Sequence, residues 1–108
     1  MNMKIYISGK ITGYEISEAE QKFKNSEDLL SAKGFEPVNP FTLSETSPDK
    51  TWEDYMIDDI RGLFDCEAIF MQSDWPQSKG ARVEHAIAVE LGLHVFYEAS
   101  GIPDGFIN

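Results

Sequence analysis

Residues 68–97 of the chain are AIFMQSDWPQSKGARVEHAIAVELGLHVFY, and they contain the clearest secondary-structure pattern in the sequence. The continuous apolar run at residues 68–71 is typical of a central parallel strand that is covered on both faces. Ser78 can cap a helix that runs to Leu91 and ends at Gly92, and residues 94–97 form a second apolar run. The order of strand, helix and strand predicts a right-handed βαβ unit.

The residues that precede this unit show the same alternation. The predicted elements are a strand at Met3–Ile7, a helix from about Ser17 to Gly34, a strand at Phe35–Asn39, and a helix that Thr51 caps and that ends near Asp65. Together they predict an α/β fold with three layers, αβα, around a flavodoxin- or Rossmann-like parallel sheet of four to five strands. Because no repeat, low-complexity tract or linker is present, we expect residues 1–108 to form a single domain.

Helical periodicity also predicts which faces of the helices are buried. In the first helix the apolar positions that fall near one face are Ile16, Ala19, Phe23, Leu29 and Leu30. In the last helix the predicted buried stripe consists of Val83, Ala86, Ile87 and Leu91.

The composition and charge of the chain exclude several classes of protein. Of the 108 residues, 42% are hydrophobic and 12% aromatic, which is ample for a packed core and excludes bulk disorder. The 9 Lys and Arg residues face 19 Asp and Glu residues, which gives a formal net charge of −10. Such a chain repels nucleic-acid polymers, because their binding depends on Lys and Arg. A small anion is still allowed where backbone amides form a local site.

Cysteine usage and hydropathy bear on the environment of the protein. The lone Cys66 cannot form an internal disulfide, and no Cys/His cluster has zinc spacing. Asp54 and Asp58 lie one helical turn apart but lack a third metal ligand. The N-terminal apolar run is too short for a signal peptide, and no stretch is long enough to span a membrane. We therefore expect a cytoplasmic protein that binds no membrane, metal or cofactor.

Ligands of parallel α/β sheets bind beyond the carboxyl ends of the strands. The loop after the first strand is SGKITG, and its residues Ser8, Gly9, Lys10 and Gly13 are candidates for binding a phosphate. The loop lacks the spacing of a Walker or dinucleotide-binding motif. Its simplest alternative interpretation is a tight turn whose glycines adopt positive φ.

The start of the last helix is the second candidate. Ser78, Lys79 and Gly80 lie in its first turn, where free amides and the helix dipole favour anions. Glu84 follows Gly80 by four residues and Ala81 by three, so small side chains leave its carboxylate approachable by a ligand. The alternative is a solvated glutamate on an exposed stripe.

Two further positions complete the candidate site. Asp58 and Asp59 lie late in a helix, where acidic side chains oppose the helix dipole, so at least one of them is a candidate for function. The alternative is an exposed acidic pair. Tyr6 lies in the first strand next to the proposed ligand edge, although a strand tyrosine is more often a core residue.

These motifs, in this order, resemble a known family. The strand and loop YISGKITG, the helical aspartate before a core strand, and the pattern SxGAxxEHAxAxxLG are similar to those of the nucleoside 2-deoxyribosyltransferase-like proteins. Within them, the 2′-deoxynucleoside 5′-monophosphate N-glycosidases show the greatest likeness. The resemblance spans about Lys4 to Tyr97, and the loop with Trp75 is typical of an uncharacterised phage and bacterial subgroup.

The resemblance implies a role for each residue that matches the family pattern. Glu84 would be the nucleophile that attacks the anomeric carbon, Asp59 would transfer a proton to the leaving base, and Tyr6 would orient the glutamate. The transferases have an aspartate six residues before the nucleophile. Here that residue is Ser78, as in the monophosphate hydrolases, where a serine contacts the 5′-phosphate. Thr12 replaces the arginine of the family loop, so Lys10 is its sole cation.

The expected function is hydrolysis of the N-glycosidic bond of a (deoxy)nucleoside 5′-monophosphate through a glutamate nucleophile. Three alternatives stay open: a nucleoside 2-deoxyribosyltransferase, a non-catalytic nucleotide-binding module with the same fold, and an interaction protein without a ligand. The partner would be a small nucleotide or nucleoside. The resemblance also implies a homodimer or higher homo-oligomer, and the apolar residues Phe106 and Ile107 are candidates for docking on a partner subunit or for core packing.

Overall fold

The computed structural model describes residues 2–43 and 47–103. Phe106 and Ile107 lie outside this range. The regular elements are the strands β1 (Lys4–Ser8), β2 (Glu36–Val38), β3 (Ala68–Met71) and β4 (His94–Tyr97), and the helices α1 (Ile16–Ala32), α2 (Trp52–Phe64) and α3 (Lys79–Leu91). Short 3-10 helices occupy Pro40–Thr42, Trp75–Gln77 and Glu98–Ser100.

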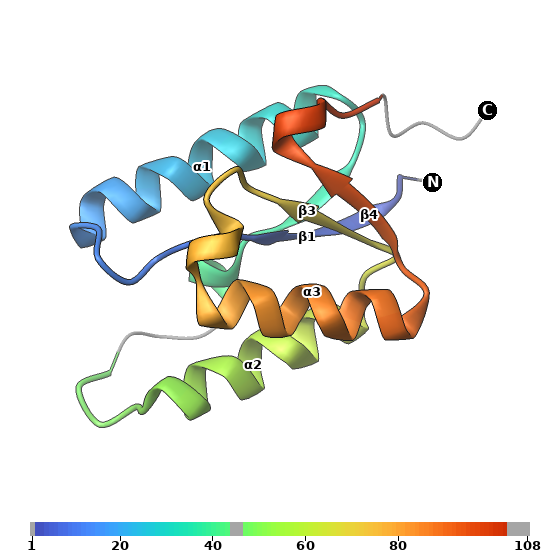
Figure 1. The fold of residues 1–108 in the computed structure, drawn as a ribbon. Coiled ribbons are helices and arrows are strands. Elements are labelled where there is room, and N and C mark those ends of the chain that lie inside the picture. The colour runs from blue at the N-terminus through green and yellow to red at the C-terminus, as the bar shows by residue number, and fades with distance from the viewer. Residues whose placement is uncertain (1, 44–46, 104–108) are drawn as a thin grey trace.

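The four strands form one parallel sheet with the order β2-β1-β3-β4. Helix α1 covers one face of the sheet, and α2 and α3 cover the other (Figure 1). The predicted three-layer α/β fold is confirmed. The chain crosses from β2 to β3 past β1, so the topological switch point lies between β1 and β3, where α/β sheets open a crevice for ligands.

The helix caps form as their sequences predict. The Thr51 side chain accepts a hydrogen bond from the Asp54 backbone, and Asp54 accepts one from the Thr51 backbone, which completes a capping box on α2. The Ser78 hydroxyl accepts from the backbone N–H of Ala81 at the start of α3. Gly92 ends α3 with φ +74°, a left-handed conformation that favours glycine.

The period-2 alternation of the strands divides the core in two. Ile5 and Ile7 of β1 pack toward α1, against residues such as Phe23 and Leu30. Tyr6 faces the opposite side, where it joins the cluster beneath α2 and α3. Ser8 lies on the same face as Tyr6, because it is two positions further along the strand.

Helix α3 buries a different face from the predicted one. Ala81, Glu84 and Ala88 are its buried residues, whereas Ala86 and Leu91 are exposed, and Val83 and Ile87 are half-buried. The small alanines let the helix approach the sheet closely. Gly80 likewise lets α3 approach α2, because a Cβ at this position would lie 3.2 Å from the Met56 sulfur. Close backbone packing therefore outweighed apolar side-chain volume in selecting the buried face.

Two of the predicted buried positions in α1 also differ. Ile16 is 61% exposed and Leu29 is 39% exposed, while Ala19, Phe23 and Leu30 are buried as expected. Ile16 is the first residue of the helix, at the wall of a cleft rather than beneath the helix.

Candidate active site

Glu84 is the centre of the candidate site. Its side chain is only 4% exposed, and its two carboxylate oxygens accept different hydrogen bonds. The Tyr6 hydroxyl donates to Oε2 at 2.8 Å, and the Ser8 hydroxyl donates to Oε1 at 2.7 Å. Helix α3 carries Glu84 over the sheet one turn after its N-terminus, and β1 presents both hydroxyls on the face beneath it. The site is therefore assembled at the carboxyl end of β1.

Two opposing effects act on the pKa of Glu84. Burial raises the pKa of this carboxyl to about 7, while the hydrogen bonds from Ser8 and Tyr6 favour its ionised form and oppose that rise. The pKa of Tyr6 lies well above its ordinary value, chiefly because of burial and then because of the nearby Glu84 charge. Tyr6 thus stays protonated and acts as a hydrogen-bond donor to Glu84.

Asp59 of α2 is the second carboxyl of the site. Burial, followed by the charges of Glu84 and Asp58, raises its pKa to about 8, although the charge of Lys50 acts in the opposite direction. Among residues 2–43 and 47–103, no hydrogen-bond donor to the Asp59 carboxyl is found, in contrast to the two donors to Glu84. Near neutral pH this arrangement favours a protonated Asp59 beside an ionised Glu84, which is the charge state of an acid paired with a nucleophile.

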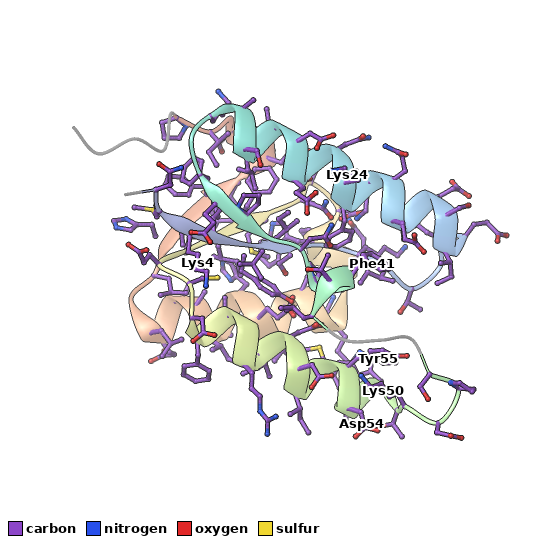
Figure 2. The ribbon with its side chains drawn as sticks, turned by 180° about the vertical axis from the view of Figure 1, so that it is seen from behind. Lys4, Lys24, Phe41, Lys50, Asp54 and Tyr55 are labelled. Carbon is purple, nitrogen blue, oxygen red and sulfur yellow. The ribbon has the colours of Figure 1, made fainter. Side chains whose placement is uncertain are left out.

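Asp58 differs from its neighbour Asp59 in its surroundings. Its carboxylate forms an ion pair with Lys50 Nζ at 3.0 Å, and its side chain is 30% exposed. Lys50 also lies over the ring of Tyr55, 5.2 Å from its centroid. Figure 2 shows Lys50 and Tyr55 together at the N-terminal end of α2. Of the two adjacent aspartates, only Asp59 lines the cleft that contains Glu84.

A cleft of about 810 Å³ opens above these carboxyls. It lies between the loop after β1, helix α2 and the N-terminus of α3. The predicted site residues that line it are Gly9, Lys10, Asp59, Ser78, Lys79, Gly80 and Glu84. Tyr6 and Ser8 do not line the cleft and lie beneath Glu84 instead. Gly13 does not line it either, and its φ of +98° fits a turn that requires glycine.

One wall of the cleft is aromatic and apolar, which the sequence motifs do not indicate. Phe41, Trp52, Tyr55 and Met56 contribute to this wall. The Lys79 ammonium lies 4.5 Å from the centroid of the Trp52 ring and links the starts of α2 and α3 across the cleft. The sequence placed Trp52, Tyr55 and Met56 in a helix, and only the position of α2 beside the cleft shows that they line it.

The lining of the cleft also has a cationic part, here called the cationic wall, in spite of the acidic chain. Lys10, Lys79 and Arg82 all line the cleft. The Ser78 hydroxyl accepts from Ala81 N–H at 3.1 Å, which leaves its own O–H available as a donor. Free amides at the N-terminus of α3 add partial positive charge. This wall can therefore hold an anion.

The structure shows neither a metal cluster nor a membrane span in the parts of the chain that it describes. No group of three or more His, Cys, Asp or Glu side chains there is arranged to hold a metal ion. Within the same residues, no helix is both long and apolar enough to cross a bilayer.

The burial of Glu84 carries a cost in stability that can be measured. The pKa of Glu84 is raised from 4.5 in the unfolded chain to about 7 in the folded one. Between these pH values the folded state retains a proton that the unfolded state has lost. The free energy of unfolding therefore falls as the pH rises through this range. We expect Glu84→Gln to stabilise the protein at pH 8 by on the order of 2–3 kcal/mol and much less at pH 5. Thermal melts at both pH values check this.

The matched control is Glu90→Gln, which removes a charge from the exposed face of the same helix. It should change the free energy of unfolding by less than about 0.5 kcal/mol at either pH. A Glu84→Gln variant that is less stable than the parent at pH 8, or equally shifted at both pH values, would contradict the expectation.

The fold of this protein is shared with a protein of known structure. The sheet order and the carboxylate site at the switch point define a flavodoxin- or Rossmann-like α/β protein. A solved structure of this fold, described as a 2-desoxiribosyltransferase from Leishmania mexicana, superposes with a TM-score of 0.67 and 20% sequence identity. The match covers 88% of this chain and 63% of that one, so the chain spans less than two thirds of that protein. The likeness shows the shared fold.

Most of the sequence also matches one protein family. The family described as Domain of unknown function (DUF4406) matches residues 3–97, and the chain belongs to this family. A search of curated proteins finds no significant relative.

Proposed function

We propose that the protein hydrolyses the N-glycosidic bond of a (deoxy)nucleoside 5′-monophosphate, with Glu84 as the nucleophile and Asp59 as the proton donor. The observation that carries the proposal is the pair of buried carboxyls at one cleft, of which one accepts two O–H hydrogen bonds and the other has a pKa raised to about 8. In glycoside cleavage, two carboxyl groups with separate roles flank the scissile bond.

The reaction has two steps. A Glu84 oxygen attacks the anomeric carbon while the bond from that carbon to the base nitrogen breaks, and the electron pair of this bond leaves with the base. The proton of Asp59 is transferred to the departing base. Water then attacks the anomeric carbon of the glycosyl ester, gives a proton to Asp59, and releases the sugar and the Glu84 carboxylate. Negative charge on Glu84 stabilises the oxocarbenium-like transition states.

The walls of the cleft fit the two ends of this substrate. The aromatic wall with Trp52 and Tyr55 suits stacking of a base. The wall with Lys10 and Lys79 and the first turn of α3 suits a phosphate dianion. Ser78 supports a monophosphate substrate, because a hydroxyl donates to a phosphate that a carboxylate would repel.

Transfer of deoxyribose to a second base is the main rival, and the fold shared with a solved 2-desoxiribosyltransferase favours it. In that reaction a free base replaces water in the second step. The two reactions differ in their products, so incubation with a second free base separates them. Formation of a new nucleotide in preference to free sugar phosphate would establish transfer.

The direct test of the proposal is chromatography of nucleoside and 2′-deoxynucleoside 5′-monophosphates after incubation with the protein. We expect free base and the corresponding sugar 5-phosphate in equal amounts. The matching nucleosides without phosphate should react with a lower kcat/KM, because they lack the anion that the cationic wall holds. A panel in which the protein binds the monophosphates but releases no base would support a non-catalytic binding module instead.

A further inference from the structure

Asp74 is the centre of a hydrogen-bond network beside the cleft. It lies between β3 and the 3-10 helix at Trp75–Gln77. Its Oδ1 accepts from the backbone N–H of Lys10 at 3.0 Å, while its Oδ2 accepts from the Tyr14 hydroxyl and from Lys22 Nζ, both at 2.7 Å. One carboxylate therefore holds two points of the loop after β1 and one point of α1.

This network joins the two loops of the switch point. The loop after β1 carries Lys10, and the segment that Asp74 begins leads to Ser78 and the N-terminus of α3. Within the described residues of loop 9–14 and segment 73–80, the hydrogen bonds that connect the two are those of Asp74 with Lys10 and Tyr14. The relative position of the two sides of the cationic wall thus depends on this carboxylate.

Asp74 also acts on the Lys10 side chain through Tyr14. The Lys10 ammonium lies 5.6 Å from the centroid of the Tyr14 ring, and the Lys22 ammonium lies 5.1 Å from it, so both form cation–π contacts with this ring. Asp74 holds the hydroxyl of that same ring. Lys10 is therefore restrained at its backbone by Asp74 and at its ammonium by a ring that Asp74 orients.

The negative charge of Asp74 is balanced by the groups that surround it. Burial raises the pKa of its carboxyl, but the hydrogen bonds from Lys22, Lys10 and Tyr14 outweigh this and hold the pKa below its ordinary value. The group is thus ionised throughout the neutral range. Its ion pair with Lys22 neutralises a negative charge that would otherwise repel an anion at Lys10.

We propose that Asp74 is a positioning residue for the phosphate end of the cleft, where it holds Lys10 and its loop in place for the substrate anion. The inference rests on the proposed function, since it takes the phosphate of the substrate as the ligand. Asp74 acts through Lys10 and Tyr14, and its removal should weaken binding of the phosphate without changing the chemistry at Glu84.

The test compares Asp74→Asn with the parent protein on one monophosphate and on the matching nucleoside. An asparagine keeps one acceptor for Lys10 but places an amide donor against Tyr14 and Lys22. We expect KM for the monophosphate to rise about tenfold, with kcat within about twofold and with kcat/KM for the nucleoside unchanged. The matched control, Asp28→Asn, removes the same charge from an exposed ion pair with Lys24 and should leave both substrates unaffected.

Equal losses on the monophosphate and the nucleoside would overturn the proposal, because they would indicate a general structural role. No loss on either substrate would also overturn it. If Asp74→Asn does not fold, Tyr14→Phe removes one of the three hydrogen bonds at a side chain that is 38% exposed, and KM for the monophosphate should rise about threefold.

Failure of the proposed function gives a different result. If the parent protein releases no base, calorimetric titration with inorganic phosphate and with the monophosphate tests Asp74 alone. Weaker binding of both to Asp74→Asn supports the positioning role without catalysis. Unchanged binding, or a parent protein that binds neither probe, overturns it.

Discussion

Glu84→Gln is expected to reduce kcat for base release by on the order of 10³-fold or more, because the amide cannot form the glycosyl ester. The substitution keeps the shape of the side chain, and the hydroxyls of Tyr6 and Ser8 can rotate to bond the amide. KM for the monophosphate should therefore stay within a few-fold. Chromatographic assays of base release, combined with calorimetric titration of the substrate, separate the two effects.

Glu90→Gln serves again as the control and should retain the activity of the parent. Mass spectrometry of the parent protein, quenched during turnover, should find a sugar phosphate attached to the peptide that contains Glu84. A Glu84→Gln variant with more than a tenth of the parent activity would show that Glu84 is not the nucleophile. Slow release that is the same in both proteins would favour the non-catalytic module.

Asp59→Asn is expected to lower kcat by about 10²–10⁴-fold for ordinary bases, because the leaving nitrogen then departs without a proton. The loss should be much smaller for a substrate whose base leaves readily without protonation. Comparison of one slow and one fast leaving group in both proteins measures this difference. Asp58→Asn is the matched control, since Asp58 is paired with Lys50 and does not line the cleft.

The pH profile provides a second readout for Asp59. With the Glu84 pKa near 7 and that of Asp59 near 8, kcat/KM of the parent should rise as Glu84 loses its proton and fall as Asp59 loses its own, so that activity peaks between these values. Asp59→Asn should lose the alkaline limb and keep the acidic one. A profile with both limbs unchanged in the variant would assign the alkaline limb to another group.

Most of the fold was predictable from local sequence patterns. The helices and strands begin and end within a few residues of the predicted positions, and Thr51 and Ser78 cap their helices as expected. Caps, glycine stops and apolar runs act over one or two turns, so a single sequence records them. The buried face of α3 was predicted wrongly, since apolar volume indicated Leu91 and the structure buries Glu84.

The candidate site was predictable in its residues but not in its contacts. The position of Glu84 after Gly80 and Ala81 marked it as unusual, yet the spacing suggested a carboxylate near the surface rather than one that is 4% exposed. Nothing local to Ser8 indicated a hydrogen bond to Glu84, and the sequence suggested a phosphate ligand instead. The Asp74 network had no local signal, because its residues come from separate elements. The aromatic wall became recognisable only from the position of α2 beside the cleft.

Local sequence was thus sufficient for the order of the elements and for the parallel sheet. Tertiary structure alone established the electrostatics of the site. Ser8 and Tyr6 lie 76 and 78 residues before Glu84, and Asp59 comes from a different helix. Burial and the proximity of charges raise the pKa values of Glu84 and Asp59, and both are properties of the folded chain. They arise only when β1, α2 and α3 pack against one another.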